Sequence, residues 1–309
     1  MKSLRIGTRG SALARWQAEF VRGALARHGV AAELVIIRTS GDRDRQSSLR
    51  VIGGKGVFTK ELEDALLEER IDLAVHSMKD MPTSLPAGLE ISAICPREDV
   101  RDALISRDAL KLDELPSGAR IGTSSLRRQT QLRHYRGDFE MVDMRGNVDT
   151  RLAKLAQGDY DAIVLAKAGL DRLGTAERIS EILPPEICLP AAGQGAMGIE
   201  TRKREDEFFA AVRQLNHRPS QLAVEAERAV LVGLEGGCQV PIGVWARMEA
   251  DSLRIDARVL SADGKESIRE SRTGSSGNAI ELGRAVAAAL LDRGADRLLR
   301  LAGRGVEHG

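Results

Sequence analysis

The stretch Arg120–Ala166, RIGTSSLRRQTQLRHYRGDFEMVDMRGNVDTRLAKLAQGDYDAIVLA, decides the fold. It holds short strand-like runs at Arg120–Thr123, Met141–Met144 and Ala162–Ala166. Segments with helical spacing, Ser125–Arg136 and Val148–Gln157, separate these runs. Strands that alternate with helices are typical of α/β proteins with mostly parallel sheets. We therefore predict such a sheet here.

The same rhythm precedes this stretch and indicates a first α/β domain. The predicted strands are Leu4–Gly7, Glu33–Thr39, Ile71–His76 and Leu89–Cys95, and the predicted helices are Ser11–His28 and Lys60–Arg70. A break near Pro96 is expected between the two domains.

The residues after a second break, near His217–Pro219, follow a different order. A helical pattern at Ser220–Leu234 is followed by three successive strand patterns and a final helix, at Val240–Ala250, Leu253–Ser261, Ser267–Thr273 and Ala279–Arg293. The turn Ala262–Gly264 joins two of the strands as a hairpin. Strands in succession followed by a helix predict a small antiparallel α+β domain.

The composition limits the function. The chain has 309 residues and a net charge of +1, which gives no overall field for nucleic acid or a membrane surface. No apolar run approaches the ~20 residues of a membrane span, and the three cysteines indicate neither a disulfide framework nor a zinc site. We expect a cytoplasmic protein. The basic residues are 37 Arg and 9 Lys, which favours a site for a small polyanion.

Two segments before Pro96 contain glycine, charged and polar residues that a purely structural role does not require. Ile52–Lys60 is glycine-rich and leads into a helix, so it is either a turn or an anion-binding loop. It lacks the spacing of a P-loop. Val75–Pro82 follows a strand, where side chains of an open α/β sheet commonly face a ligand. It is either a polar turn fixed by proline or an acid/base group with a cation beside it.

Two strand-to-helix junctions in the second domain repeat one design. Gly122–Arg128 and Arg145–Arg151 each combine hydroxyls or glycine with arginines at a helix start. Helix capping explains Ser124, Ser125 and Asn147. It does not explain the four arginines, which favour an anion cradle.

Cys238 lies in the segment Leu234–Pro241, between Gly-Gly and Gln, and not on an apolar stripe. It is the best candidate for a reactive or modified thiol. Cys95 and Cys188 are expected to be small core residues.

Seven motifs in this order together resemble the porphobilinogen deaminase (hydroxymethylbilane synthase) family over almost the whole chain. They are RIGTRGS (5–11), GGKGVFTKELE (53–63), AVHSMKDMP (74–82), GTSSLRRQTQL (122–132), MRGNVDTRLAKL (144–155), LPAAGQGAMGIE (189–200) and LEGGCQVPIG (234–243). Gly10 and Met81 are small departures from the family pattern.

The resemblance implies a monomeric transferase of tetrapyrrole (haem) biosynthesis. It would condense four porphobilinogen molecules head to tail into hydroxymethylbilane with release of four ammonia. The chain would grow on a dipyrromethane cofactor held by a thioether to Cys238. The implied fold has two α/β domains like those of periplasmic binding proteins, residues 1–95 with 196–216 and residues 96–195. A third, α+β domain, residues 217–309, would carry the cofactor cysteine.

The resemblance also implies residue roles, without a metal. Asp80 would be the catalytic carboxylate. The cofactor would be bound by Lys55, Ser77, Lys79, Asp80, Thr123, Ser125, Arg127, Arg128, Arg145 and Gly146. The substrate would be bound by Arg9, Phe58, Arg145, Arg151 and Gln194. The alternative is a non-catalytic binding protein of the same two-domain architecture, which explains the arginines but neither Cys238 nor the third domain.

Overall fold

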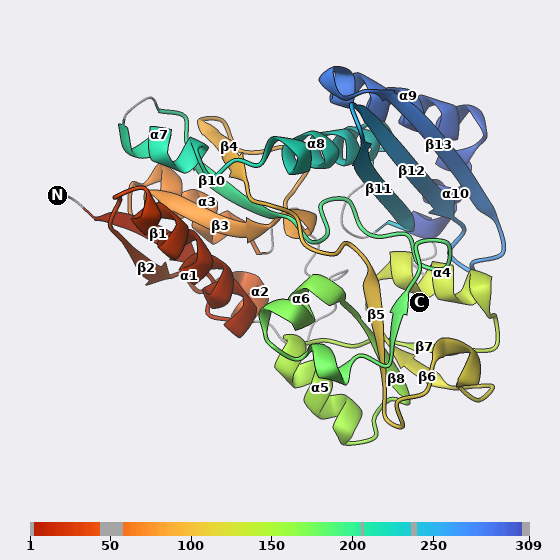
Figure 1. Ribbon diagram of the computed structural model, residues 1–309. Coiled ribbons are helices and arrows are strands. Elements are labelled where there is room, and N and C mark those ends of the chain that lie inside the picture. The colour runs from red at the N-terminus through yellow and green to blue at the C-terminus, as the bar shows by residue number, and fades with distance from the viewer. Residues whose placement is uncertain (1–2, 44–57, 205–206, 236–239, 305–309) are drawn as a thin grey trace. The chain divides into compact units, whose positions relative to one another are not determined.

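The computed structural model describes residues 3–43, 58–204, 207–235 and 240–304. The chain divides into two compact units, Met1–Glu98 with Ala196–Gln221, and Asp99–Gly195 with Leu222–Gly309. Figure 1 labels their helices and strands. Two five-stranded sheets and one three-stranded sheet confirm the predicted α/β class with a small antiparallel C-terminal part.

The first unit contains a five-stranded sheet of order β2-β1-β3-β10-β4. Its strands are β1 Leu4–Thr8, β2 Ala32–Ile36, β3 Leu73–Ser77, β4 Leu89–Ile94 and β10 Met197–Arg202. Its helices are α1 Ala12–Arg27, α2 Ser40–Arg43, α3 Lys60–Leu67 and α7 Glu207–Arg213, with the 3-10 turn η1 at Met78–Asp80. β1, β2 and β3 run parallel, and β10 is antiparallel to both of its neighbours.

α1 and α3 each pack against this sheet in a hydrophobic core of their own. Val75 of β3 packs in one core with Val21 and Leu25 of α1, whereas Ala74 packs in another core with Leu62 of α3. Successive strand residues point to opposite faces, so α1 and α3 cover opposite faces of this sheet.

The sheet of the second unit has the order β7-β6-β8-β5-β9, which gives the same spatial pattern of strand directions with a different chain order. Its strands are β5 Asp102–Ser106, β6 Arg120–Gly122, β7 Glu140–Val142, β8 Ala162–Ala166 and β9 Glu181–Leu183. Its helices are α4 Leu126–Tyr135, α5 Val148–Ala156 and α6 Lys167–Arg172, with 3-10 turns η2 Leu112–Glu114 and η3 Ala176–Arg178. In both sheets the fourth strand is the antiparallel one, β10 in the first and β5 in the second.

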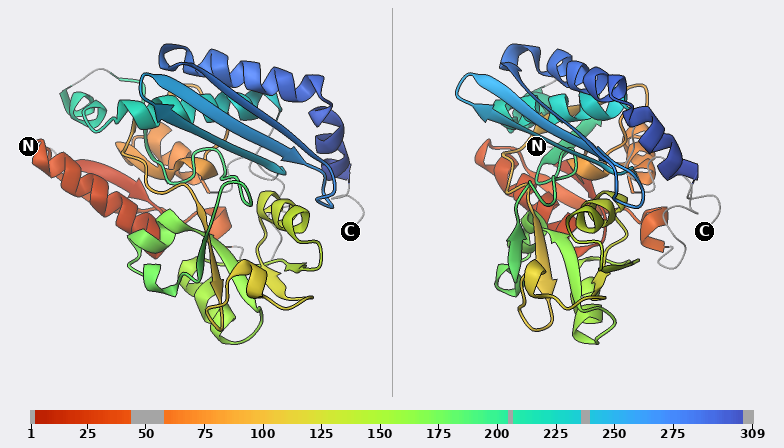
Figure 2. Two further views of the ribbon diagram at one scale, coloured as in Figure 1. Left: turned by 45° about the vertical axis from the view of Figure 1, so that its right-hand side comes forward. Right: turned by 90° about the vertical axis from the view of Figure 1, so that its right-hand side faces the viewer.

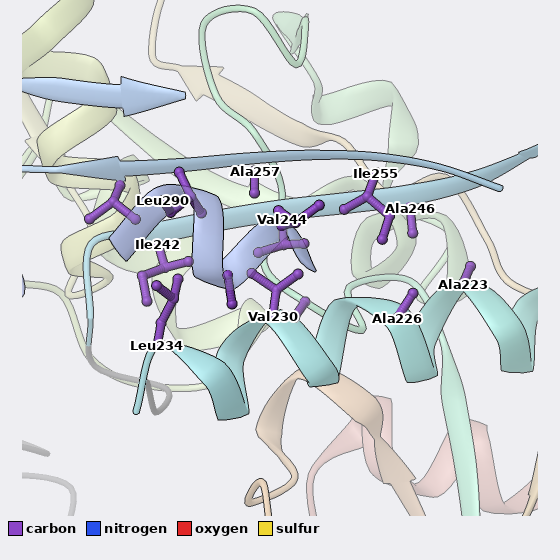
Figure 3. Packing of buried hydrophobic residues seen from close by; sticks show 14 of the residues in the cluster. Ala223, Ala226, Val230, Leu234, Ile242, Val244, Ala246, Ile255, Ala257 and Leu290 are labelled. Atoms are coloured by element: carbon purple, nitrogen blue, oxygen red, sulfur yellow. The ribbon is translucent and has the colours of Figure 1, made fainter. Parts of the chain in front are cut away.

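The C-terminal part is an antiparallel sheet, β11 Ile242–Glu249, β12 Ser252–Leu260 and β13 Ser267–Ser275. Helices α8 Arg218–Gly233, α9 Ala279–Asp292 and α10 Ala295–Arg304 lie on one side of it (Figures 1 and 2), and η4 Ser276–Asn278 leads into α9. Their shared core joins Ala226 and Val230 of α8 to Val244, Ala257 and Leu290 (Figure 3).

The predicted hairpin turn is confirmed. Gly264 has a φ of +77° in the turn between β12 and β13, a region that suits glycine. Within the described residues, no helix has both the length and the apolar character that crossing a bilayer requires.

Candidate active site

The turn after β3 carries Asp80, the predicted catalytic carboxylate, and the start of this turn is firmly anchored. Met78 is 2 % exposed, and its backbone N–H donates to the carbonyl of Ala196 at 3.0 Å. A Cβ on Gly198 of β10 would lie 2.2 Å from the Met78 sulfur, so only glycine leaves room for this side chain. The backbone of the turn is therefore held against β10.

Ser77, predicted to bind the cofactor, has a partner inside the protein. The Gln17 side chain on α1 donates to the Ser77 hydroxyl at 2.9 Å, and Gln17 is buried. The sequence analysis missed Gln17, although a glutamine on the apolar face of a predicted helix was a usable signal.

Lys79 and Asp80 follow Met78 in the same turn and are more exposed than Met78. Lys79 is half-buried and Asp80 is exposed. No side chain in the described part of the chain donates a hydrogen bond to the Asp80 carboxylate. Asp80 can therefore meet a ligand without first breaking an ion pair.

Arg9 lies at the same edge of the first sheet, because it follows β1, the parallel neighbour of β3. Its guanidinium lies over the Phe58 ring, 4.1 Å from the ring centroid. The structure thus brings together two residues that were predicted to bind substrate. Lys55 and Cys238 lie outside the described residues.

In the second unit, two helices begin directly after the ends of neighbouring strands. β6 and β7 pair in parallel and lead into α4 and α5. Ser125 and Asn147 occupy the N-cap positions, but neither side chain makes a capping hydrogen bond. The capping explanation is therefore wrong for these two residues, and both helix starts keep N–H groups for another acceptor.

Thr123 and Ser124 organise the junction instead of capping it. Thr123 is fully buried, and its hydroxyl accepts a weak bond from the Ser125 N–H at 3.3 Å. The Ser124 hydroxyl accepts from the Met144 N–H at 2.9 Å and donates to the Met144 carbonyl at 2.8 Å. These two hydrogen bonds join the end of β6 to the end of β7.

The second junction holds an arginine with unused hydrogen-bonding capacity. Nη2 of Arg145 is buried and has no hydrogen-bond partner among the described residues. Arg151 donates from Nε to the Gly146 carbonyl at 2.8 Å. Gly146 has a φ of +115°, and a Cβ there would lie 2.7 Å from Thr150. This backbone path therefore requires glycine.

Arg127 and Arg128, both predicted cofactor ligands, share one buried carboxylate. Asp102 accepts from Nη1 of Arg127 at 2.7 Å and from Nη2 of Arg128 at 2.7 Å. Burial alone would raise the pKa of Asp102, but the two guanidinium charges outweigh it and hold that pKa well below its usual range. Two cations share one anion, so the cluster keeps a surplus positive charge.

Gln194 completes this cluster. Its amide donates to Asp102 at 2.9 Å and to the Val100 carbonyl at 2.7 Å. Cys188 is buried against Asp102, and burial raises the pKa of its thiol to about 12. Cys95 is buried as well, so both cysteines are confirmed as core residues. The sequence analysis missed Asp102, because nothing local marks it as the partner of residues so far along the chain.

The described residues include no group of His, Cys, Asp and Glu side chains arranged to hold a metal ion. What they offer is hydrogen-bond donors and positive charge: free helix N-termini, the unpaired nitrogen of Arg145 and the surplus charge beside Asp102. Such an arrangement suits a ligand with several carboxylates.

Distant structural likenesses are found among periplasmic binding proteins. The methionine-binding protein MetQ matches with a TM-score of 0.46 at 14% identity, over 69% of this chain and 89% of that one. The VFT2 domain of Bordetella pertussis BvgS matches with a TM-score of 0.42 at 17% identity, over 69% of this chain and 86% of that one.

Sequence comparisons are far closer. The family model "Porphobilinogen deaminase, dipyromethane cofactor binding domain" matches residues 4–210, and "Porphobilinogen deaminase, C-terminal domain" matches residues 221–292. The porphobilinogen deaminase of Pelotomaculum thermopropionicum is 50% identical over 303 residues, 97% of each chain. That of Moorella thermoacetica is 50% identical over 302 residues, 97% of this chain and 96% of the relative. With these matches along nearly its whole length, the chain belongs to the porphobilinogen deaminase family.

Proposed function

We propose individual residue roles within the activity of this family. The chain is a transferase that condenses four porphobilinogen molecules into hydroxymethylbilane on a dipyrromethane cofactor, a step of tetrapyrrole biosynthesis. Family membership rules out the alternative of a non-catalytic binding protein.

The residues of the second unit fit the dipyrromethane group. Each of its rings carries an acetate and a propionate, so the group brings two carboxylates per ring. Nη2 of Arg145 is buried without a partner, and α4 and α5 begin without side-chain caps. Burying carboxylates requires such compensation. Held through Cys238, the group would supply the free ring carbon to which the first substrate pyrrole is joined, and each later pyrrole would be joined to the ring before it.

The other cofactor ligands follow from the same chemistry. Arg127, Arg128 and Gly146 would contribute charge and backbone around the carboxylates, with Thr123 and Ser125 supplying hydroxyls. Lys55, Ser77 and Lys79 would bind from the first unit. Arg9, Arg151, Gln194 and Phe58 would bind the incoming substrate. The surplus charge beside Asp102 supports this assignment, because a fully neutralised arginine pair would attract a carboxylate less strongly.

Asp80 would act on the substrate at two points. Loss of ammonia from the aminomethyl group of porphobilinogen leaves a cationic pyrrole, and a fixed carboxylate near the pyrrole nitrogen stabilises that charge. After the new carbon–carbon bond forms, the same carboxylate can accept the proton released from the attacking ring carbon. The exposed, unpaired carboxylate of Asp80 on its anchored turn is the observation that carries this role.

Substituting Asp80 tests its role. Asp80→Asn removes the charge and should lower turnover by at least ~10²-fold, whereas Asp80→Glu should retain partial activity. Single-turnover ammonia release on cofactor-loaded protein measures both rates. The cofactor should stay attached in both variants, and the intact mass checks this. Equal rates for wild type and Asp80→Asn would contradict the role of Asp80.

We also propose that the protein is a cytoplasmic monomer with domains at residues 1–95 with 196–216, 96–195 and 217–309. The absence of a long apolar run supports the location. The place of β10 in the first sheet and the separate core of the C-terminal sheet support the domain bounds. Sedimentation of the cofactor-loaded chain tests the oligomeric state.

A further inference from the structure

A cluster of three ionisable side chains is buried beneath the Asp80 turn. His76 of β3 is 5 % exposed, Glu200 of β10 is 0 % exposed and Glu63 of α3 is 7 % exposed. Nε2 of His76 lies 2.8 Å from Oε2 of Glu200. None of the three has a place in the roles proposed above.

One oxygen of each carboxylate in the cluster has no hydrogen-bond donor among the described residues. Oε1 of Glu63 and Oε1 of Glu200 are both buried without a hydrogen-bond partner among the described residues. An ionised carboxylate oxygen in such surroundings is costly, and the usual response is to take up a proton. Burial raises the pKa of Glu63, and the neighbouring Glu200 carboxylate raises it further, while Thr59 and His76 oppose these effects.

The three residues connect the elements that carry the candidate site in the first unit. His76 directly precedes Ser77, which begins the Asp80 turn, and its strand pairs with β10 in the register His76↔Gly198. Glu63 lies in the first turn of α3, shortly after Phe58. A change in the charge of the cluster therefore acts on both neighbouring segments at once.

We propose that Glu63 holds a proton beside the Glu200 carboxylate and that these two glutamates, through His76, act as positioning residues for the Ser77–Asp80 turn. This inference rests on the proposed role of Asp80. The proton removes the repulsion between two buried carboxylates, so that Glu200 can accept a hydrogen bond from His76 and keep the end of β3 in place. None of the three residues touches the substrate.

The proposal has a definite pH dependence. The groups that face the proton are Glu63 and Asp64 from α3, Glu200 from β10 and His76 from β3. A carboxyl group whose pKa is raised by folding stabilises the folded state less as the pH rises above its unfolded value. Raising the pH above that unfolded value should therefore weaken the hold on the turn and lower turnover before the protein unfolds.

Three variants separate the proton from the fold. Glu63→Gln mimics the protonated acid. Turnover at neutral pH should therefore be retained, and the decline of turnover with rising pH should weaken. Glu200→Gln alters the partner of His76, and kcat should fall ~10- to 100-fold with little change in KM, as expected for a displaced reacting group. Glu68→Gln, at the C-terminal end of the same helix and exposed, is the matched control and should change neither.

Infrared spectra of the full, cofactor-loaded chain with ¹³C-labelled glutamate test the proton directly. A protonated, buried carboxylic acid gives a carbonyl band separate from the carboxylate bands, and this band should be lost or shifted in Glu63→Gln. Absence of the band in the wild type at neutral pH, or a Glu200→Gln variant as active as Glu68→Gln, would overturn the inference. If the band is present but Asp80→Asn remains fully active, only the role of Asp80 fails.

Discussion

At the scale of single residues, Asp102 holds the arginines of the second unit in place. Its carboxylate is fully buried and bonds to Arg127, Arg128 and Gln194. Removing its charge would leave two guanidinium groups buried without an anion. Loss of one partner from a buried ion pair commonly costs about 3–5 kcal/mol.

We therefore predict that Asp102→Asn lowers the free energy of unfolding by about 3–5 kcal/mol, measured by denaturant titration at pH 7. The pKa of Asp102 is lowered by folding, so its stabilisation is present above its unfolded pKa of about 3.9 and is lost as the pH falls below it. The difference between variant and wild type should therefore shrink in acid. Asp138→Asn, which removes an exposed partner of Arg136, is the control and should leave stability nearly unchanged. Equal midpoints for both variants would contradict this account.

The residues that carry charge could be predicted from sequence, but their partners could not. The arginine excess and the junctions at Gly122–Arg128 and Arg145–Arg151 are local signals. Asp102 lies 25 residues before Arg127, and Gln17 lies 60 residues before Ser77. Only the folded topology brings such pairs together, since side-chain contacts of this kind leave no periodic pattern.

At the scale of elements, the start of α5 after β7 depends on a special backbone path at Gly146. Its φ is +115°, and a Cβ at this position would lie 2.7 Å from the Thr150 side chain. Any residue other than glycine would therefore be strained here. This path turns the chain into α5 and places the Gly146 carbonyl beside Arg151.

Gly146→Ala should therefore destabilise the protein by about 1–3 kcal/mol, the usual cost of a strained backbone conformation. It should also reduce cofactor assembly, because the start of α5 and Arg151 would shift. Gly137→Ala is the matched control, since a Cβ there meets nothing closer than 3.6 Å. Thermal denaturation and intact mass measure the two effects. A Gly146→Ala variant as stable as Gly137→Ala would show that the backbone path can be adjusted.

Three strands of the two α/β sheets could not be predicted, β5, β9 and β10, and all three form antiparallel pairs. The alternation of strands and helices indicated parallel strands such as β1, β3, β6 and β8, and the structure has them. β5 and β10 are no shorter than these, but they follow no helix of their own sheet and pair with strands that are distant in the sequence. A local pattern cannot distinguish such a strand from a connecting loop.

At the scale of the whole molecule, the chain leaves its first unit near residue 98, forms a second sheet with the same pattern of strand directions and returns through β10. β10 contributes Gly198, on which Met78 packs, and Glu200, which bonds to His76. The base of the Asp80 turn is therefore complete only when the returning strand has been added. Resemblance to a family, and not periodicity, predicted that the first domain is discontinuous.

The last prediction concerns the covalent state of the whole chain. The protein purified from cells that make porphobilinogen should be heavier than its sequence by one dipyrromethane unit, and Cys238→Ala should abolish this excess mass. The other two thiols are poor anchors: Cys95 is buried, and burial raises the pKa of Cys188 to about 12, so little thiolate forms at neutral pH. Cys95→Ala and Cys188→Ala are therefore the controls, and both should keep the full excess mass where they fold. Intact-mass spectrometry under denaturing conditions measures all four proteins, and peptide mapping locates the modification. An excess that persists in Cys238→Ala would place the anchor elsewhere. A wild-type chain without excess mass would show that the cofactor is not built on this protein in those cells.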